Sequence, residues 1–463
     1  MPETHRALNW HLFAICVIAS VGGLLFGFDT AVIAGTTTDL TNTFHLSPLA
    51  LGVTVSSALW GTVVGAALAG RASDIFGRRA CLRALGLLYV VTALGCSFAW
   101  GWYSLLFFRL FAGLAVGGSS VISPTYISEV APPKLRGRLV MAFQFNVVLG
   151  MLLAYFSNYC VGLLHLGAAD WRWKFGIAAI PALGFFSALF LIPESPRWLV
   201  GKGRAREAME ILERNGDPEP AFELSEIVKS LRGSNTSTEN RVFQWRYRFP
   251  IFLAISIGMF NQLSGINAIL YYLNDIFEKA GFNRVSSDSQ AVLIGITNLI
   301  AVSLAMSVID KIGRRKLLLI GSVGTAICLF GVATIFRLNQ HQGALLWFLV
   351  GFIGFFSFSQ GAVIWVYISE IFPNRVRAKG QSIGSFTHWF MDAIVSIVFP
   401  IVAVRWHAAP FYFFAGVMAT QFFVVLFCFP ETRGISLEEI EDRLLFIKKE
   451  GEGAISAEQE STT

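Results

Sequence analysis

The chain has 463 residues, of which 54% are hydrophobic and only 14% are charged, and its formal net charge is +6. Together with a mean hydropathy of +0.60, this composition excludes an ordinary soluble globular protein and indicates a protein embedded in a membrane. The positive charge follows the membrane topology described below and gives no support to nucleic-acid binding.

Runs of about twenty apolar residues cross a bilayer as helices, and twelve such runs follow one another along the chain. We expect membrane-spanning helices near 11–34, 49–70, 81–101, 104–128, 139–164, 172–192, 249–277, 289–309, 317–336, 344–368, 381–403 and 409–429. The first run is too long for the apolar part of a signal peptide and is followed by further spans, so we expect it to be retained. The sequence therefore predicts an all-α membrane protein with twelve transmembrane helices.

Lysine and arginine lie mostly on one side of these spans. The side that holds both termini carries 29 of the 36 basic residues, the opposite side carries six, and Arg109 lies inside a span. Because basic loops stay in the cytoplasm, we expect a multi-pass protein of the cell membrane, inner or plasma, with both termini cytoplasmic.

Three motifs recur in the same order along the chain. The pairs are "DIFGRR" at 74–79 with "DKIGRR" at 310–315, "YISEVAPPKLRGR" at 126–138 with "YISEIFPNRVRAK" at 367–379, and "PESPR" at 193–197 with "PETRG" at 430–434. Their offsets are nearly equal, between 236 and 241 residues, so we interpret the chain as two related six-helix bundles.

The repeat and the polar segment between its copies predict the domain organisation. We expect an N-terminal six-helix bundle at 1–192, an intracellular helical linker at 193–248, a C-terminal six-helix bundle at 249–440 and a cytoplasmic tail at 441–463. In the linker, apolar residues recur with helical spacing at 205–212 and 224–231. Two short amphipathic helices are therefore predicted there.

Charged residues of the repeated motifs gather at the cytoplasmic ends of the spans. A solvated face with little energetic effect is one interpretation, but recurrence in both halves favours ion pairs that close the cytoplasmic side and break during release. The predicted gating charges are Asp74, Arg78, Arg79, Glu129, Arg136, Glu194 and Arg197 in the first half, and Asp310, Arg314, Arg315, Glu370, Arg377 and Glu431 in the second.

Glycines with the GxxxG spacing occur in two spans, as Gly61 with Gly65 and Gly113 with Gly117. Such pairs let two helices approach closely, which helps helices that move past one another. Ordinary tight packing explains the spacing equally well.

Cysteine usage and motif content argue against metal and enzyme chemistry. The six cysteines occur singly, without ligand histidines between them. No motif combines a nucleophile with a base and an orienting group. We therefore expect no metal site, no cofactor and no enzymatic activity.

Several ordered motifs together resemble one known family. They are "GRR" twice, "PTYISEVAPPKLRGR", "PESPRWL", "NQLSGINAILYY", "WVYISEIFP", "RAKG" and "PETRG". This set is similar to that of the sugar porter branch of the major facilitator superfamily, across roughly 11–440. The resemblance implies that fold, with four intracellular helices, and a monosaccharide or a similar polyol as substrate.

A sugar site needs amides for the hydroxyls and aromatic planes for the ring faces. The seventh span offers amides at Asn261, Gln262 and Asn267. Gln262 and Asn267 are five residues apart, about 140° around an ideal helix, and would point away from each other. An unwound helix at Ser264-Gly265 would bring both amides to one side.

The family resemblance extends this set of residues. It makes Gln262 and Asn267 sugar ligands, Tyr271 and Tyr272 parts of an outer gate, and Gln144 and Asn298 further hydrogen-bonding partners. Phe26, Trp365 and Trp389 match the aromatic wall of the family's site, while His388 and Asp392 stand where amides are common. Taken singly, amides that join helices and tryptophans that fill cores are the alternative interpretation.

Asp29 lies near the end of the apolar run "LLFGFDTAVIAG". A lone carboxylate in hydrocarbon costs several kcal/mol, so it must pair with a cation, face water or bind a proton. Arg109 in the fourth span is the predicted partner, and the pair could be merely structural. In the family, however, proton-coupled members have an acid in this motif and an arginine in the fourth span.

We therefore expect uptake of a hexose or pentose by proton symport through alternating access, with Asp29 and Arg109 as the coupling residues. The alternatives are a passive uniporter, in which the pair is a static brace, and a sugar sensor that hardly transports. The expected partners are a small sugar, a proton and the lipid bilayer, and we expect the protein to work as a monomer.

Overall fold

The structure is a computed structural model, and it describes residues 10–215, 219–234, 242–372 and 376–433. These residues form helices joined by short loops, with no strand among them. The predicted all-α class is therefore confirmed. The predicted tail at 441–463 lies outside the described residues.

Residues 1–237, 269–299 and 396–401 form one compact unit, and residues 238–268, 300–395 and 402–463 form another. We call them the first and the second unit. They differ from the sequence halves because 269–299, which belong to the second half, pack with the first half.

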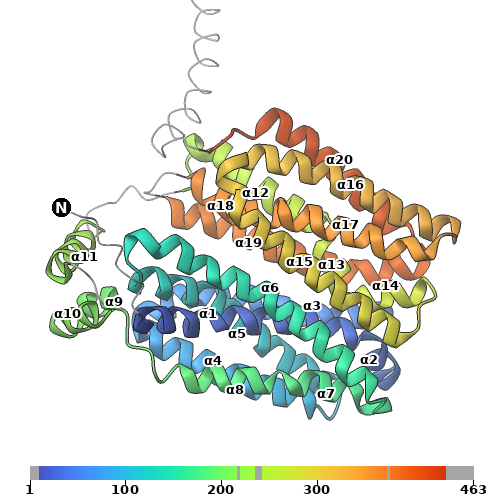
Figure 1. Ribbon diagram of the computed structural model, residues 1–463, viewed down its shortest axis with the longest axis horizontal. Helices are drawn as coiled ribbons and strands as arrows, with labels where there is room; N and C mark the ends of the chain where they lie inside the picture. Colours follow the sequence, from blue (N-terminus) through green and yellow to red (C-terminus); the bar gives the residue numbers. More distant parts are fainter. Residues whose placement is uncertain (1–9, 216–218, 235–241, 373–375, 434–463) are drawn as a thin grey trace, which may run out of the picture. The chain divides into compact units, whose positions relative to one another are not determined.

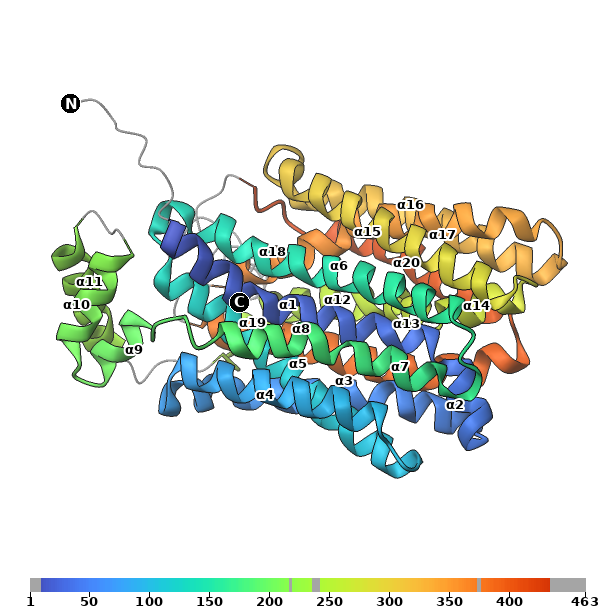
Figure 2. The same ribbon diagram turned by 60° about the horizontal axis from the view of Figure 1, so that its bottom comes forward.

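The helices before the linker are α1 (Trp10–Val32), α2 (Thr37–Phe44), α3 (Pro48–Phe76), α4 (Arg78–Ser97), α5 (Trp102–Val130), α6 (Pro133–Leu163), α7 (Asp170–Ile177) and α8 (Ala179–Ala188). Those in the linker are α9 (Pro196–Gly201), α10 (Ala205–Arg214) and α11 (Pro220–Ser234). Figure 1 labels them along the chain, and Figure 2 shows α9, α10 and α11 grouped at one end of the first unit. The two predicted linker helices are confirmed by α10 and α11, and α10 buries Ala208 and Leu212.

The later helices are α12 (Arg248–Leu263), α13 (Ile266–Tyr271), α14 (Leu273–Lys279), α15 (Arg284–Ile312), α16 (Arg314–Leu338), α17 (Leu345–Phe358), α18 (Gln360–Glu370), α19 (Arg377–Arg405) and α20 (Ala409–Cys428). Those of the second unit bury a core that includes Leu253, Leu317, Val363, Tyr367 and Val425.

Eleven helical stretches within the described residues are long and apolar enough to cross a membrane, and they meet eleven of the twelve expected spans. The expected span at 172–192 differs, because it consists of the short helices α7 and α8 in tandem. Pro181 explains the break, since proline has no N–H to donate to the carbonyl of Ile177 and its ring crowds that carbonyl. The expected span at 249–277 ends earlier, at Tyr271, and α14 follows it as a separate helix.

Helices α3 and α5 approach each other closely through the GxxxG glycines. A Cβ atom on Gly113 would lie 1.7 Å from the carbonyl oxygen of Ala58, and one on Gly61 would lie 1.9 Å from that of Leu110. Only glycine fits at such distances, so the close approach expected from the GxxxG spacing is present. The pair anchors the fourth span, which carries Arg109, against the second.

Candidate functional site

Asp29 on α1 and Arg109 on α5 form an ion pair inside the first unit. The Nη1 atom of Arg109 lies 3.4 Å from Oδ1 of Asp29, and the two side chains are 3% and 21% exposed. The guanidinium also donates from Nη2 to the carbonyl of Val55 at 3.5 Å and lies 5.7 Å from the ring centre of Phe175. The cation therefore keeps partners of its own if the carboxylate becomes neutral.

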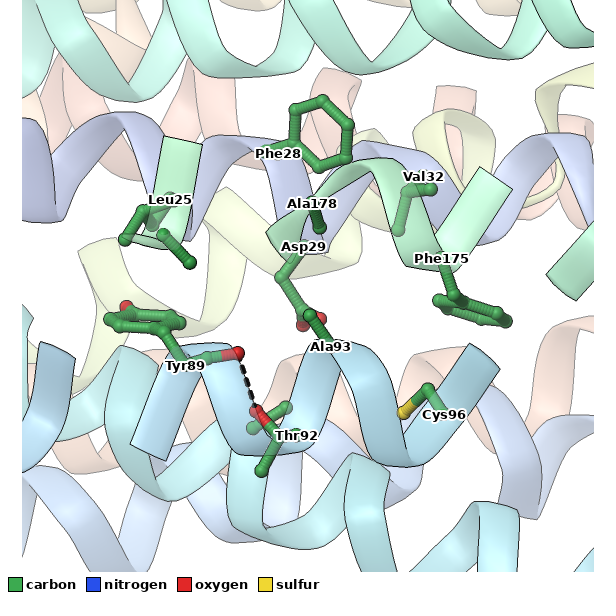
Figure 3. Close-up of a pocket in the computed structure, with 12 residues that line it drawn as sticks. Leu25, Phe28, Asp29, Val32, Tyr89, Thr92, Ala93, Cys96, Phe175 and Ala178 are labelled. Atoms are coloured by element: carbon green, nitrogen blue, oxygen red, sulfur yellow. Dashed lines mark hydrogen bonds between the residues drawn. The ribbon is translucent and has the colours of Figure 1, made fainter. Parts of the chain in front are cut away.

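A small cavity adjoins the Asp29 carboxylate. Figure 3 shows this side chain pointing from α1 toward α4, where Ala93 faces it and Tyr89, Thr92 and Cys96 complete that wall. The cavity has a volume of about 20 Å³, which is room for about one water molecule. A group that exchanges a proton needs room for water beside it.

The wall of this cavity contains residues that the sequence gives no reason to select. Tyr89 is buried and shares a 2.8 Å hydrogen bond between its hydroxyl and that of Ser119. Thr92 donates to the carbonyls of Leu88 and Tyr89 at 2.7 and 3.2 Å. No motif distinguishes these residues from ordinary helix packing, and only the fold brings them to Asp29.

In the second unit, the seventh span breaks where the sequence predicts. Helix α12 ends at Leu263, Gly265 has a φ of +81°, and α13 begins at Ile266. This left-handed conformation suits glycine, since other residues adopt it rarely and with strain. The break separates Gln262 from Asn267 and frees each amide from the angular spacing of a continuous helix.

Both amides meet the same helix, α19. Nε2 of Gln262 lies 3.0 Å from Nε2 of His388, and Nδ2 of Asn267 donates to Oδ2 of Asp392 at 2.7 Å. His388 and Asp392 are four residues apart and share one helix face. The predicted convergence of the two amides is therefore present, with each amide held by a residue that departs from the family's usual amide.

Aromatic rings surround His388 in the same unit. The ring centre of Trp365 lies 5.0 Å from that of His388. The ring centre of Trp389 lies 4.8 Å from that of His388. Asn261, Gln262 and His388 are buried, and Asp392 is fully so. The second unit thus collects amides, aromatic planes and a carboxylate in one place, which are the groups that bind a polyhydroxylated ring.

The first unit holds the remaining predicted sugar residues. Gln144 and Phe26 are half-buried on α6 and α1. Asn298 is buried on α15 with its Nδ2 atom 3.7 Å from the sulfur of Met151.

The two predicted gate residues, Tyr271 and Tyr272, are buried as well. The Tyr272 hydroxyl donates to the carbonyl of Ser396 at 3.0 Å and its ring stacks on Phe399. That these residues join the second unit's set in one sugar site stays a prediction.

The chain matches a known protein family. Residues 15–444 match the family described as "Sugar (and other) transporter". The chain belongs to this sugar transporter family. The arabinose-proton symporter of Bacillus subtilis is 36% identical over 449 residues, which cover 95% of this chain and 97% of that protein. The D-xylose-proton symporter of Escherichia coli is 34% identical over 470 residues, with 93% and 95% covered.

A solved structure of the xylose transporter XylE from E. coli, in a partially occluded inward open conformation, superposes on this sugar transporter with a TM-score of 0.83 at 31% identity. The match covers 92% of this chain and 100% of that chain. The predicted major facilitator fold is confirmed. Since the family consists of transporters, the expectation that the chain is no enzyme is confirmed too.

The repeated charges of this sugar transporter form two similar clusters. In the first unit, Arg78 contacts Asp74 and Glu129 at 3.0 Å, and Glu194 accepts from the backbone N–H groups of Arg78 and Arg79 at 2.9 and 3.1 Å. Gly77, with a φ of +96°, places those amides. This carboxylate caps the start of α4, where unpaired amides and the helix dipole favour an anion.

The second unit repeats the arrangement. Arg314 contacts Asp310 and Glu370 at 2.9 Å. Glu431 accepts from the N–H groups of Arg314 and Arg315 at 2.9 and 3.2 Å. Gly313 has a φ of +97°, as its counterpart does. Each cluster is thus tied within its own unit, and the predicted gating by charges that interlock between the halves stays a prediction.

Three members of the predicted gating set remain. Arg197 is exposed, and Nε of Arg377 donates to the carbonyl of Phe372 at 3.4 Å. The side chain of Arg136 lies outside the described residues.

Proposed function

We propose that this protein carries a monosaccharide, a pentose or a hexose, across the membrane together with a proton, by alternating access. The observation that carries the proposal is the Asp29–Arg109 pair beside a cavity of water size. The similarity to symporters that couple arabinose or xylose to protons supports the same reading of the pair.

The geometry of the pair suits a carboxyl group that changes its charge. At 3.4 Å the contact is longer than a strong charge-assisted hydrogen bond. Protonation of Asp29 removes the attraction to Arg109 and also removes the cost of a charge in an apolar surrounding. Arg109 then retains the carbonyl of Val55 and the ring of Phe175. The neutral state is the one in which the sugar site closes and turns to the other side.

Sugar binding is assigned to the groups around α12, α13 and α19. Gln262 and Asn267 supply amides for adjacent hydroxyls, and Trp365 supplies a plane for the C–H face of the ring. Asp392 serves as an acceptor for a sugar hydroxyl as well as for Asn267. In the empty site His388 and Asp392 hold the amides in place, and a sugar that enters replaces these contacts with its own hydroxyls.

We also propose a placement in the cell, which the sequence and the family support. The chain is a multi-pass membrane protein, and the excess of basic residues on one side of the spans supports cytoplasmic termini and a position in the inner or plasma membrane. We assign a monomer as the working unit, with the sugar, the proton and the bilayer as its partners.

Transport in proteoliposomes tests this function. Labelled xylose, arabinose and glucose are offered with and without an inward pH gradient, and the external pH is recorded. We expect one of these sugars to accumulate only when the gradient is present, and its addition to make the outside more alkaline. Sugar equilibration with no alkalinisation would establish a uniporter, and binding with no flux would establish a sensor.

A further inference from the structure

A polar cluster lies at one end of the first unit, where residues from both sequence halves meet. Figure 1 and Figure 2 place α2, α7 and α14 at the end of the unit opposite α10 and α11. We call this set the outer cluster. It consists of Thr37, Thr38, Asp39, Asp170 and Lys174 from the first half, and Asn274, Asp275, Glu278, Arg284 and Asp288 from the second.

An ion pair fixes one side of the outer cluster. Nη1 of Arg284 donates to Oδ1 of Asp39 at 2.7 Å, and Nη2 pairs with Oδ2 of the same carboxylate, so the contact is bidentate. Nη2 also lies 3.4 Å from Oδ2 of Asp170. Asp39 is 9% exposed, which makes this a desolvated pair and not a solvated surface one.

A second ion pair lies deeper. Nζ of Lys174 is 3.8 Å from Oδ2 of Asp288 and donates to the carbonyl of Gly35 at 2.7 Å. The two side chains are 0% and 1% exposed. Asn274 donates to the other oxygen of Asp288. The Lys174–Asp288 pair therefore links α7 of the first half to α15 of the second half, out of contact with water.

The third part of the cluster holds a carboxyl group with one unsatisfied oxygen. Thr37 donates to Oδ1 of Asp275 at 3.0 Å, and the Thr38 hydroxyl lies 3.2 Å from the same oxygen and 3.1 Å from Oε2 of Glu278. Oδ2 of Asp275 is buried and accepts no hydrogen bond from the described residues. A proton on Asp275 removes the uncompensated charge from this carboxyl group and leaves the single Thr38 hydrogen for Glu278.

The charges around this pair also favour a bound proton. Among the described residues, the carboxyl groups of Asp39, Asp170, Asp275, Glu278 and Asp288 face three cations, Lys174, Lys279 and Arg284. The Tyr272 hydroxyl is the remaining titratable group close to Asp275 among the described residues. Burial raises the pKa of the Glu278 carboxyl, and the hydrogen bond from Thr38 offsets that rise only in part.

We infer that the outer cluster is a pH-sensitive latch: it joins the two sequence halves at the end of the first unit opposite α10 and α11, and it closes when a proton binds to the pair of Asp275 and Glu278. The inference rests on the proposed function, because a latch acts only where the halves separate during transport. The closed latch binds the proton more tightly than the open latch does, so a lower pH on that side of the protein favours the closed state.

Spin-label distances test the latch without any sugar. Labels are placed on Asn42→Cys and Ser289→Cys, two exposed residues near the cluster, in the full chain with Cys81, Cys160 and Cys428 replaced by serine. We expect the short-distance population to grow as the pH falls, with the ratio of short to long changing by up to about tenfold per pH unit for one linked proton. A distribution that does not change with pH would overturn the inference.

Three variants make the result specific. The double change Asp275→Asn with Glu278→Gln removes the charge of both carboxyl groups, so the short distance should persist at every pH. Arg284→Gln should favour the long distance at every pH. Arg405→Gln, which removes the same charge at an exposed position, should behave as the parent does. A pH response that survives the double change would assign the proton elsewhere.

The latch and the transport proposal fail separately. Asp29→Asn should leave the pH response of the distances unchanged, because Asp29 is not part of the outer cluster. If sugar uptake proves uncoupled while the distances still follow pH, the latch stands and the symport proposal falls. If uptake is coupled to the proton gradient and the distances do not change with pH, the symport proposal stands and the latch falls.

Discussion

The Asp29 carboxylate lies between a buried guanidinium and a cavity with room for about one water molecule. Its surroundings act on its charge in opposite directions, because burial favours the neutral acid and Arg109 favours the anion. Two opposed influences of this kind are what the proposed coupling role of Asp29 requires, and a static ion pair does not require them.

Asp29→Asn keeps the size of the side chain and removes its charge. We expect the accumulation ratio of sugar across a proteoliposome membrane to fall to about one, because no proton gradient can then bias the cycle. Exchange of labelled for unlabelled sugar should continue. The measurement is labelled-sugar uptake with an inward pH gradient, compared with counterflow.

Glu210→Gln is the matched control for that variant, since it makes the same change from carboxylate to amide on a side chain that is 65% exposed on the linker helix α10. It should accumulate sugar as the parent does. Concentrative uptake by Asp29→Asn at the parental level would make the Asp29–Arg109 pair a structural brace.

Single residues of the site were predictable where the chemistry restricts the residue type. An acid and an arginine inside apolar spans, or three amides near a Ser-Gly pair, are visible in the sequence. Such polar residues are costly in hydrocarbon, so they are rare there unless they have a function. Tyr89, Ser119 and Thr92 were not predictable, since hydroxyls in helices commonly bond to their own backbone. The contacts of Asn267 with Asp392 and of Gln262 with His388 needed the folded chain as well.

The presence of a helix was easier to predict from the sequence than the positions at which helices break. The apolar runs predict nearly all the spans, because their length matches the bilayer. The break between α7 and α8 and the one between α17 and α18 at Ser359 were not predicted, although the break at Gly265 was. A glycine with an amide on each side gives a physical reason for a break at Gly265. Proline and serine, the residue types at Pro181 and Ser359, occur in many continuous transmembrane helices.

The contact of α3 with α5 gives a test at the scale of elements. In Gly113→Ala the new methyl group would lie 1.7 Å from the Ala58 carbonyl oxygen, so the helices must separate. We expect a loss of about 1–3 kcal/mol in the free energy of unfolding. The thermal unfolding midpoint of the detergent-solubilised protein measures it.

Gly70→Ala on α3 is the control, because its methyl group would meet nothing within 4 Å. Its midpoint should stay unchanged or rise slightly, since alanine favours a helix more than glycine does. Equal midpoints for Gly113→Ala and Gly70→Ala would show that the close approach does not limit stability.

At the scale of the whole molecule, the motifs that are repeated in the sequence also have similar local structures in the two units. Glu194 and Glu431 cap equivalent helices next to glycines with nearly equal φ angles. The repeat was predictable because the motifs are copied in sequence. The outer cluster was not, since its residues come from dissimilar helix ends and loops, where a lone acid resembles an ordinary cap.

The equivalence of the two caps makes a quantitative prediction. Glu194→Ala and Glu431→Ala should each reduce the free energy of unfolding by about 1–3 kcal/mol, because each leaves two or more backbone N–H groups without an acceptor. Thermal unfolding midpoints measure both variants side by side. Asp74→Ala and Asp310→Ala, whose side chains are 70% and 82% exposed, should change the midpoint little. A large effect in one half alone would contradict the functional equivalence of the two caps.

The lining of the Asp29 cavity bears on which ion drives the cycle. A sodium ion must exchange its hydration shell for several oxygen ligands at once, as hard cations do. The described side chains around this chamber are mainly apolar, and the Asp29 carboxylate is the one charged group among them. A bare hydrogen ion requires only a lone pair on that carboxylate, so the scarcity of oxygens discriminates against alkali metals.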